Sequence, residues 1–182
     1  VTVRHGFAFF DPATEKLEHI IEPESHLPNN RFNDGKCDAH GRYWAGSVEF
    51  GCRDPVGSLY RLTPDQHCER MDTEYAVTNG PTWSSDWKTM YFNDSHLGHV
   101  YVFDFDLDSG TISNKRLFLE FGPEDGSPDG MTTDAEGCLW IAQWGAGKVT
   151  RRDPQGKVMQ TIELPCNHVS SFDPWPLGLP LW

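Results

Sequence analysis

Apolar and polar residues alternate along much of the chain in short stretches that turn-forming residues separate. The alternation is strict at residues 100–107, as is typical of a half-buried antiparallel strand, and similar stretches occur at 1–10 and 58–62. Glycine, proline and asparagine interrupt the pattern so often that no helix longer than a turn or two is predicted. The sequence therefore predicts an all-β fold.

Two motifs recur along the chain at a similar spacing. In the first, an acid or amide followed by glycine leads into a strand, a turn and a second strand. Its aligned positions are Asp34, Asn79 and Asp129. The second motif is a glycine followed by an alternating strand and a turn. It begins at Gly6, Gly57, Gly98 and Gly147. The two motifs together indicate one repeated unit of several short strands, roughly 45 to 50 residues long.

A repeat of roughly 40 to 50 residues has the length of a four-stranded β-propeller blade. At 182 residues the chain holds fewer than four such units, whereas propellers usually close with about four to eight blades. The first residues already lie in a predicted strand. We therefore expect the chain to form part of a ring.

Composition limits the classes of partner. A formal net charge of -12 argues against nucleic acid, whose binding depends on Lys and Arg, although solubility alone also accounts for this charge. No apolar run approaches a membrane span and no signal peptide is recognisable, so we expect no membrane partner. Five cysteines without CxxC spacing indicate neither a disulfide framework nor a zinc site, and favour a cytoplasmic location.

The first motif also carries candidate chemistry. If blades are arranged radially, Asp34, Asn79 and Asp129 would surround one axial opening with oxygen donors, which suit Ca²⁺, Mg²⁺ or Mn²⁺. Asp-Gly and Asn-Gly are also ordinary dipeptides of hairpin turns. From the residues alone, both interpretations stay open.

Several segments, in order, resemble the SMP-30/gluconolactonase/regucalcin family. They include Arg31-Phe32-Asn33-Asp34-Gly35-Lys36, Thr78-Asn79-Gly80-Pro81-Thr82-Trp83, Pro128-Asp129-Gly130-Met131 and Gly137-Cys138-Leu139-Trp140. The resemblance extends to about Cys166. We expect a partial propeller of this family at 1–171 and a divergent tail, rich in Pro and Trp, at 172–182.

The resemblance implies a partial six-bladed β-propeller that hydrolyses sugar lactones with one divalent cation (Ca, Zn, Mg or Mn). Asn79 and Asp129 match two of the family's metal ligands, and Asp129 also matches its general base. Arg31 and Asn33 match positions that line the substrate pocket, although Arg31 could instead form a surface salt bridge. The family's third ligand, a glutamate of the first blade, would precede Val1, and no residue here is assigned to it.

Three hypotheses about function follow from these observations. The leading one is a metal-dependent hydrolase whose substrate is a small sugar lactone. The second is a non-catalytic propeller that binds calcium or sugar. The third is an inactive fragment that lacks the first-blade glutamate.

Overall fold

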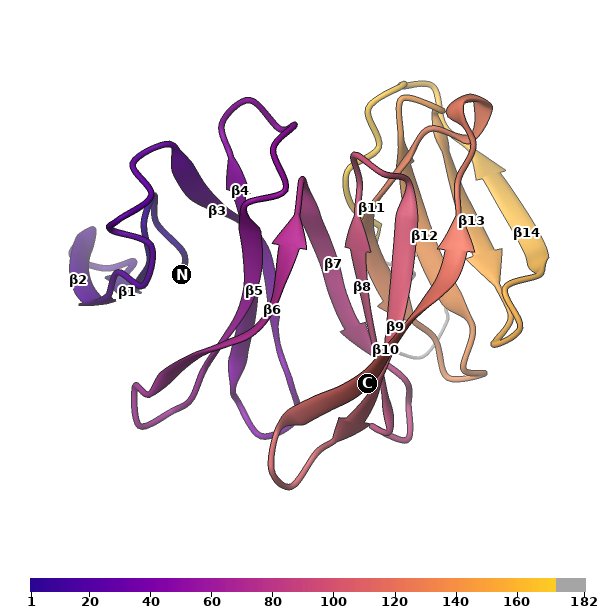
Figure 1. The fold of residues 1–182 in the computed structure, drawn as a ribbon. Coiled ribbons are helices and arrows are strands. Elements are labelled where there is room, and N and C mark those ends of the chain that lie inside the picture. Colours follow the sequence, from indigo (N-terminus) through magenta and orange to yellow (C-terminus); the bar gives the residue numbers. More distant parts are fainter. Residues whose placement is uncertain (173–182) are drawn as a thin grey trace. The chain divides into compact units, whose positions relative to one another are not determined.

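The structure, a computed structural model that describes residues 1–172, consists of antiparallel strands joined by short turns (Figure 1). Within the described residues the one helix is η1, a single 3-10 turn at Pro123–Asp125. The all-β class predicted from the alternating pattern is therefore confirmed. The tail predicted at 172–182 lies, apart from Phe172, outside the described residues.

The chain divides into two compact units, Val1–Thr78 and Asn79–Trp182. In the first unit, strands that are adjacent in sequence pair to form one two-stranded and one four-stranded sheet. The two-stranded sheet pairs β1 (Phe7–Asp11) with β2 (Lys16–Ile21). The four-stranded sheet has the order β3 (Asn30–Cys37), β4 (Tyr43–Glu49), β5 (Gly57–Leu62) and β6 (Cys68–Tyr75).

The second unit contains two four-stranded sheets that also follow chain order. One consists of β7 (Thr78–Trp83), whose first residue closes the first unit, β8 (Thr89–Asp94), β9 (His99–Asp106) and β10 (Thr111–Glu120). The other consists of β11 (Ser127–Thr133), β12 (Leu139–Trp144), β13 (Lys148–Arg152) and β14 (Val158–Glu163). Each sheet is an antiparallel meander of the size predicted for one blade, and β5 and β9 lie where the alternation predicted strands.

The strand predicted at 1–10 is shorter than expected. The Val3 amide donates to the Gly6 carbonyl at 2.8 Å and closes a turn, so that the Ala8 amide donates back to the Val1 carbonyl at 3.0 Å. A Cβ at Gly6 would lie 1.9 Å from the carbonyl oxygen of Ile21. This close approach of two chain segments requires glycine and separates the first residues from β1.

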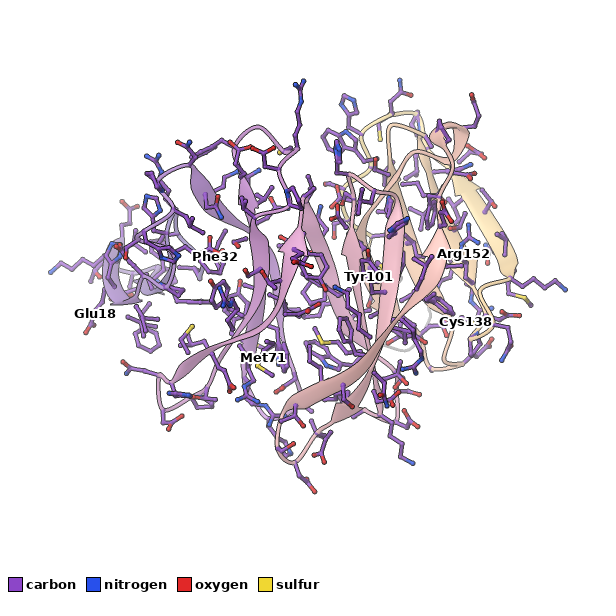
Figure 2. All side chains as sticks on the ribbon, in the orientation of Figure 1. Glu18, Phe32, Met71, Tyr101, Cys138 and Arg152 are labelled. Atoms are coloured by element: carbon purple, nitrogen blue, oxygen red, sulfur yellow. The ribbon has the colours of Figure 1, made fainter. Side chains whose placement is uncertain are left out.

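Each unit has an apolar core of its own. In the first unit Phe7 of β1 packs against Phe32 of β3 with ring centroids 4.8 Å apart, and Tyr60 of β5 also contacts Phe32, which Figure 2 labels. In the second unit Val100 of β9 and Met131 of β11 belong to one buried cluster. Burial of these inward-facing side chains stabilises the packing of one sheet against the next.

A buried aspartate fixes the turn between the first two strands in two of the blades. Asp38 accepts a hydrogen bond from the Trp44 indole at 2.9 Å, and Asp134 accepts one from the Trp140 indole at 2.8 Å. Each carboxylate also accepts from an arginine Nε, at 2.6 and 2.7 Å respectively. Both indoles are almost fully buried. The polar contact therefore locks the large core residue of the second strand to the preceding turn.

The environment of Asp134 makes this contact depend on pH. Burial alone raises the pKa of the Asp134 carboxyl, but hydrogen bonds from the Arg151 guanidinium, a backbone amide and the Trp140 indole outweigh it and hold the pKa below its ordinary value. A carboxyl with a lowered folded pKa stabilises the fold above its unfolded pKa of about 3.9. The contribution is lost as the pH falls through the folded pKa.

We expect Asp134→Asn to lower the free energy of unfolding by about 3 kcal/mol at neutral pH, because buried donors lose a charged acceptor. The difference from wild type should shrink below about pH 4. Urea denaturation across this range measures both effects, with Asp54→Asn in an exposed loop as the matched control. Equal losses for the two variants at neutral pH would contradict the role given to Asp134.

Candidate functional site

The polar residues of the first motif lie where the first strand of a blade carries a β-bulge. The pairing of β3 with β4 jumps from Phe32 to Gly35, and the pairing of β11 with β12 jumps from Pro128 to Met131. The residues inside the two bulges are Asn33-Asp34 and Asp129-Gly130. A bulge changes the direction of side chains at a strand, which is a common way to form a site.

The structure corrects the alignment of the repeat by one residue. The turn after the first strand begins at Asp38 in one blade and at Asp134 in another. The carbonyl of each aspartate accepts a hydrogen bond from the amide of the residue three positions later. The residue five positions before each of these aspartates is Asn33 or Asp129. Asn33 is therefore the equivalent of Asp129, and the alignment of Asp34 with Asp129 was wrong. Both Asn33 and Asp34 suit the motif by residue type, and only the pairing of the strands distinguishes them.

Asn79, on β7, is buried, with 7% of its surface exposed. Its side-chain amide nitrogen donates to the Ser95 hydroxyl at 2.9 Å. The same hydroxyl donates to the carbonyl of Pro128 at 2.6 Å. Ser95, just after β8, therefore connects the Asn79 side chain to the main chain immediately before Asp129.

The main chain of Asp129 is held by a second contact. The side-chain amide of Asn93 donates to the Asp129 carbonyl at 2.7 Å. Gly80 has a φ of +65°, and a Cβ there would lie 2.8 Å from Asn93 Nδ2 and 2.8 Å from the Asp129 carbonyl oxygen. A glycine after Asn79 is thus required both by the left-handed backbone and by the close approach of β11.

Arg31 and Asn33 form a separate group in the first unit. The Arg31 guanidinium donates to the Asn33 side-chain oxygen at 2.7 Å and to the Phe32 carbonyl at 3.2 Å. The Asn33 side-chain nitrogen donates to the Thr78 carbonyl at 2.8 Å. Both side chains are half-buried and held in defined positions, and their substrate-binding role stays a prediction.

The donors of Asn79 and Asp129 suit a hard divalent cation by type, because one carries an amide oxygen and the other a carboxylate. The Asn79 amide nitrogen points to Ser95, so the oxygen is the atom that would coordinate a cation. Two side chains supply fewer oxygens than the six to eight that Ca²⁺ typically takes. Among the residues that the structure describes, no three His, Cys, Asp or Glu side chains gather in a way that could hold a metal ion. The assignment of Asn79 and Asp129 as ligands stays a prediction.

Four-stranded antiparallel meanders whose first strand carries a candidate polar residue define a protein built of β-propeller blades. The chain belongs to the SMP-30/Gluconolactonase/LRE-like family, whose sequence profile matches residues 1–172. In the described part of the chain no helix is long and apolar enough to cross a membrane.

Relatives include regucalcin of Sus scrofa, 44% identical over 176 residues, which cover 93% of this chain and 59% of that protein. An uncharacterised protein of Sulfolobus acidocaldarius is 38% identical over 172 residues, which cover 94% of this chain and 62% of the relative. The chain thus spans less than two thirds of the length of these relatives.

Two solved structures have a similar fold. A calcium-binding protein, regucalcin, from Agrobacterium tumefaciens superposes with a TM-score of 0.88 at 29% identity, over 93% of this chain and 58% of that one. A gluconolactonase from Xanthomonas campestris superposes with a TM-score of 0.72 at 26% identity, over 88% of this chain and 56% of that one. The expectation of a partial propeller of this family is confirmed.

The residues that hold the candidate ligands in place were not predicted from the sequence. Asn93 and Ser95 contact the main chain of β11 although they precede it by more than thirty residues. One sequence signal could have found them, because the polar run 93–95 directly follows the apolar residues 90–92 of β8. Such a run at the end of a buried strand commonly carries a functional or structural contact.

We expect Ser95→Ala to lower the free energy of unfolding by about 1 to 3 kcal/mol, because the buried Asn79 amide and Pro128 carbonyl lose their shared partner. Urea denaturation measures this loss. Ser113→Ala, on the exposed surface of β10, is the matched control and should change stability by less than about 0.5 kcal/mol. A loss no larger than that of the control would exclude Ser95 as the residue that joins the two strands.

Proposed function

We propose that this protein binds one divalent cation through Asn79 and Asp129 and hydrolyses a sugar lactone. The observation that supports it most is the shared support of the two residues, since Ser95 bonds both the Asn79 amide and the carbonyl preceding Asp129. Membership of the family and the similarity to a protein named gluconolactonase support the same function. We further propose that it acts in the cytoplasm on a small molecule, without nucleic acid or membrane partners.

Asp129 is the proposed general base. Its half-buried carboxylate would accept a proton from the attacking water. The hydrogen bonds from Asn93 to the Asp129 carbonyl and from Ser95 to the Pro128 carbonyl limit movement of the main chain there. A divalent cation, when bound, supplies the Lewis acidity that polarises a lactone carbonyl. The amide oxygen of Asn79 and the carboxylate of Asp129 are the donors that this chain would contribute.

Arg31 and Asn33 are proposed to bind the substrate. A guanidinium presents several N–H donors in a planar arrangement and binds hydroxyls and carboxylates well. The bond from Arg31 to Asn33 fixes the orientation of both groups, so little side-chain entropy would be lost when a polyhydroxylated ring binds. We therefore propose that Arg31 and Asn33 contribute to KM more than to kcat.

Asp129→Asn tests the general base. We expect kcat for lactone hydrolysis to fall by about 10² to 10⁴, because the amide cannot accept the proton from water. Acid release from a sugar lactone is measured at constant pH with added Ca²⁺, Mg²⁺, Mn²⁺ or Zn²⁺, and again after the metal is removed with EDTA.

Asp54→Asn, the same chemical change in an exposed loop, should keep wild-type turnover. Turnover by Asp129→Asn at the wild-type rate would remove Asp129 as the base. A wild-type protein without metal-dependent turnover of any sugar lactone would overturn the proposed reaction.

A second candidate function is calcium binding without catalysis. It is favoured by the relatives named regucalcin, one of which is described as a calcium-binding protein. Titration calorimetry, combined with the turnover assay, separates the two functions. Ca²⁺ binding that is weakened by Asn79→Ala, together with no lactone turnover, supports this second candidate. A protein that hydrolyses lactones only with bound cation supports the first.

A further inference from the structure

A fully buried carboxylate lies in the loop that leads into β3. Glu24 is 0% exposed. One of its oxygens accepts from the Ser47 hydroxyl at 2.6 Å and from the Tyr60 hydroxyl at 3.1 Å, and the other accepts from the Asn30 side-chain amide at 3.0 Å. Burial of a carboxylate is costly unless hydrogen bonds compensate it. Here donors from the start of β3, from β4 and from β5 converge on one side chain of the preceding loop.

The donors around Glu24 are themselves fixed. Burial, and then the charge of Glu24, raise the pKa of Tyr60, so that its hydroxyl keeps its proton and remains a donor at neutral pH. The Ser47 hydroxyl also accepts from the Ser58 amide at 2.9 Å. The carboxylate therefore lies at the centre of a rigid group and not at the end of a mobile side chain.

One chain of hydrogen bonds leads from this group to the proposed substrate residues. The Ser47 carbonyl accepts from the Thr78 hydroxyl at 2.9 Å, and the Thr78 carbonyl accepts from the Asn33 side chain at 2.8 Å. Asn33 in turn accepts from Arg31 at 2.7 Å. All of these residues lie in the first unit.

A second, shorter connection runs along the backbone. Asn30 donates to Glu24 and directly precedes Arg31 in the chain. It is 2% exposed and pairs with Glu49 at the start of β3. Glu24 thus restrains the start of β3 through Asn30. It also restrains the Asn33 side chain, through Ser47 and Thr78.

We propose that Glu24 is a positioning residue that holds Arg31 and Asn33 in the orientation for binding the sugar lactone. The inference rests on the proposed function, because that function gives Arg31 and Asn33 their role in substrate binding. The hydrogen bonds that join these residues to Glu24 are observed independently of it. It assigns to this buried carboxylate an effect on substrate affinity and none on the proton transfer at Asp129. Ser95 bonds the Asn79 side chain and the Pro128 carbonyl, and Asn93 bonds the Asp129 carbonyl, so the candidate ligands have supporting contacts of their own within the second unit.

The test compares Glu24→Gln with Glu22→Gln, which makes the same change at an exposed position of the same loop. Glu24→Gln turns an acceptor oxygen into a donor that faces other donors. We expect KM for the lactone to rise about tenfold while kcat stays within about twofold, since a hydrogen bond to a charged group contributes about this much. Glu22→Gln should leave both constants unchanged.

Hydrogen–deuterium exchange gives a readout that needs no activity. In Glu24→Gln the amides of residues 31–34 should exchange about tenfold faster, whereas those of β11 and β12 should keep the wild-type rate. Faster exchange throughout the protein, with a fall in melting temperature and no selective effect on 31–34, would mean that Glu24 only stabilises the fold and would overturn the proposal.

Thr78→Val keeps the shape of the side chain and removes only the hydroxyl that donates to Ser47. It should raise KM several-fold without altering the surroundings of Glu24, so the proposal stays testable if Glu24→Gln fails to fold. Unchanged KM and unchanged exchange at 31–34 in Thr78→Val would overturn it. If the wild-type protein hydrolyses no lactone, the proposed function fails, and the exchange rates still decide whether Glu24 orders Arg31 and Asn33.

Discussion

The hydrogen bond from a buried indole to the aspartate of the preceding turn sets the register on which the blades depend. Where Asp38 holds Trp44 and Asp134 holds Trp140, the length of the first hairpin is fixed. One extra residue in the first strand must then be accommodated as a bulge further along. The bulge in each case carries the candidate site residue, Asn33 or Asp129, so a core contact determines where that side chain lies.

The site is supported by contacts between the end of one blade's second strand and the first strand of the following blade. The Ser47 carbonyl at β4 accepts from Thr78, which begins β7. Ser95, after β8, donates to Pro128 in β11. In both cases the bonded residue directly precedes a candidate ligand, Asn79 or Asp129. The repeated contact explains how a β-rich scaffold with short turns can hold polar side chains in defined positions.

The candidate site could be predicted in part. Asn79 and Asp129 were predicted because the motif around each repeats, and Ser95 contacts both the Asn79 side chain and the carbonyl of Pro128, which precedes Asp129. The equivalent residue in the first unit was assigned to Asp34 instead of Asn33, because adjacent Asn and Asp residues both suit the pattern. Glu24 was not found, since nothing in a polar, proline-bearing loop distinguishes a buried carboxylate from an exposed one.

The sequence by itself determined the strands, their turns and the repeat, because alternation, Gly and Asp act on neighbouring residues and leave a local pattern. Only the tertiary structure decided the register of each bulge and the partners of each polar side chain. Those depend on contacts between residues far apart in the chain, such as Asn93 with Asp129 and Glu24 with Tyr60. The free energy of such contacts comes from burial and hydrogen bonding in three dimensions, which a linear pattern does not record.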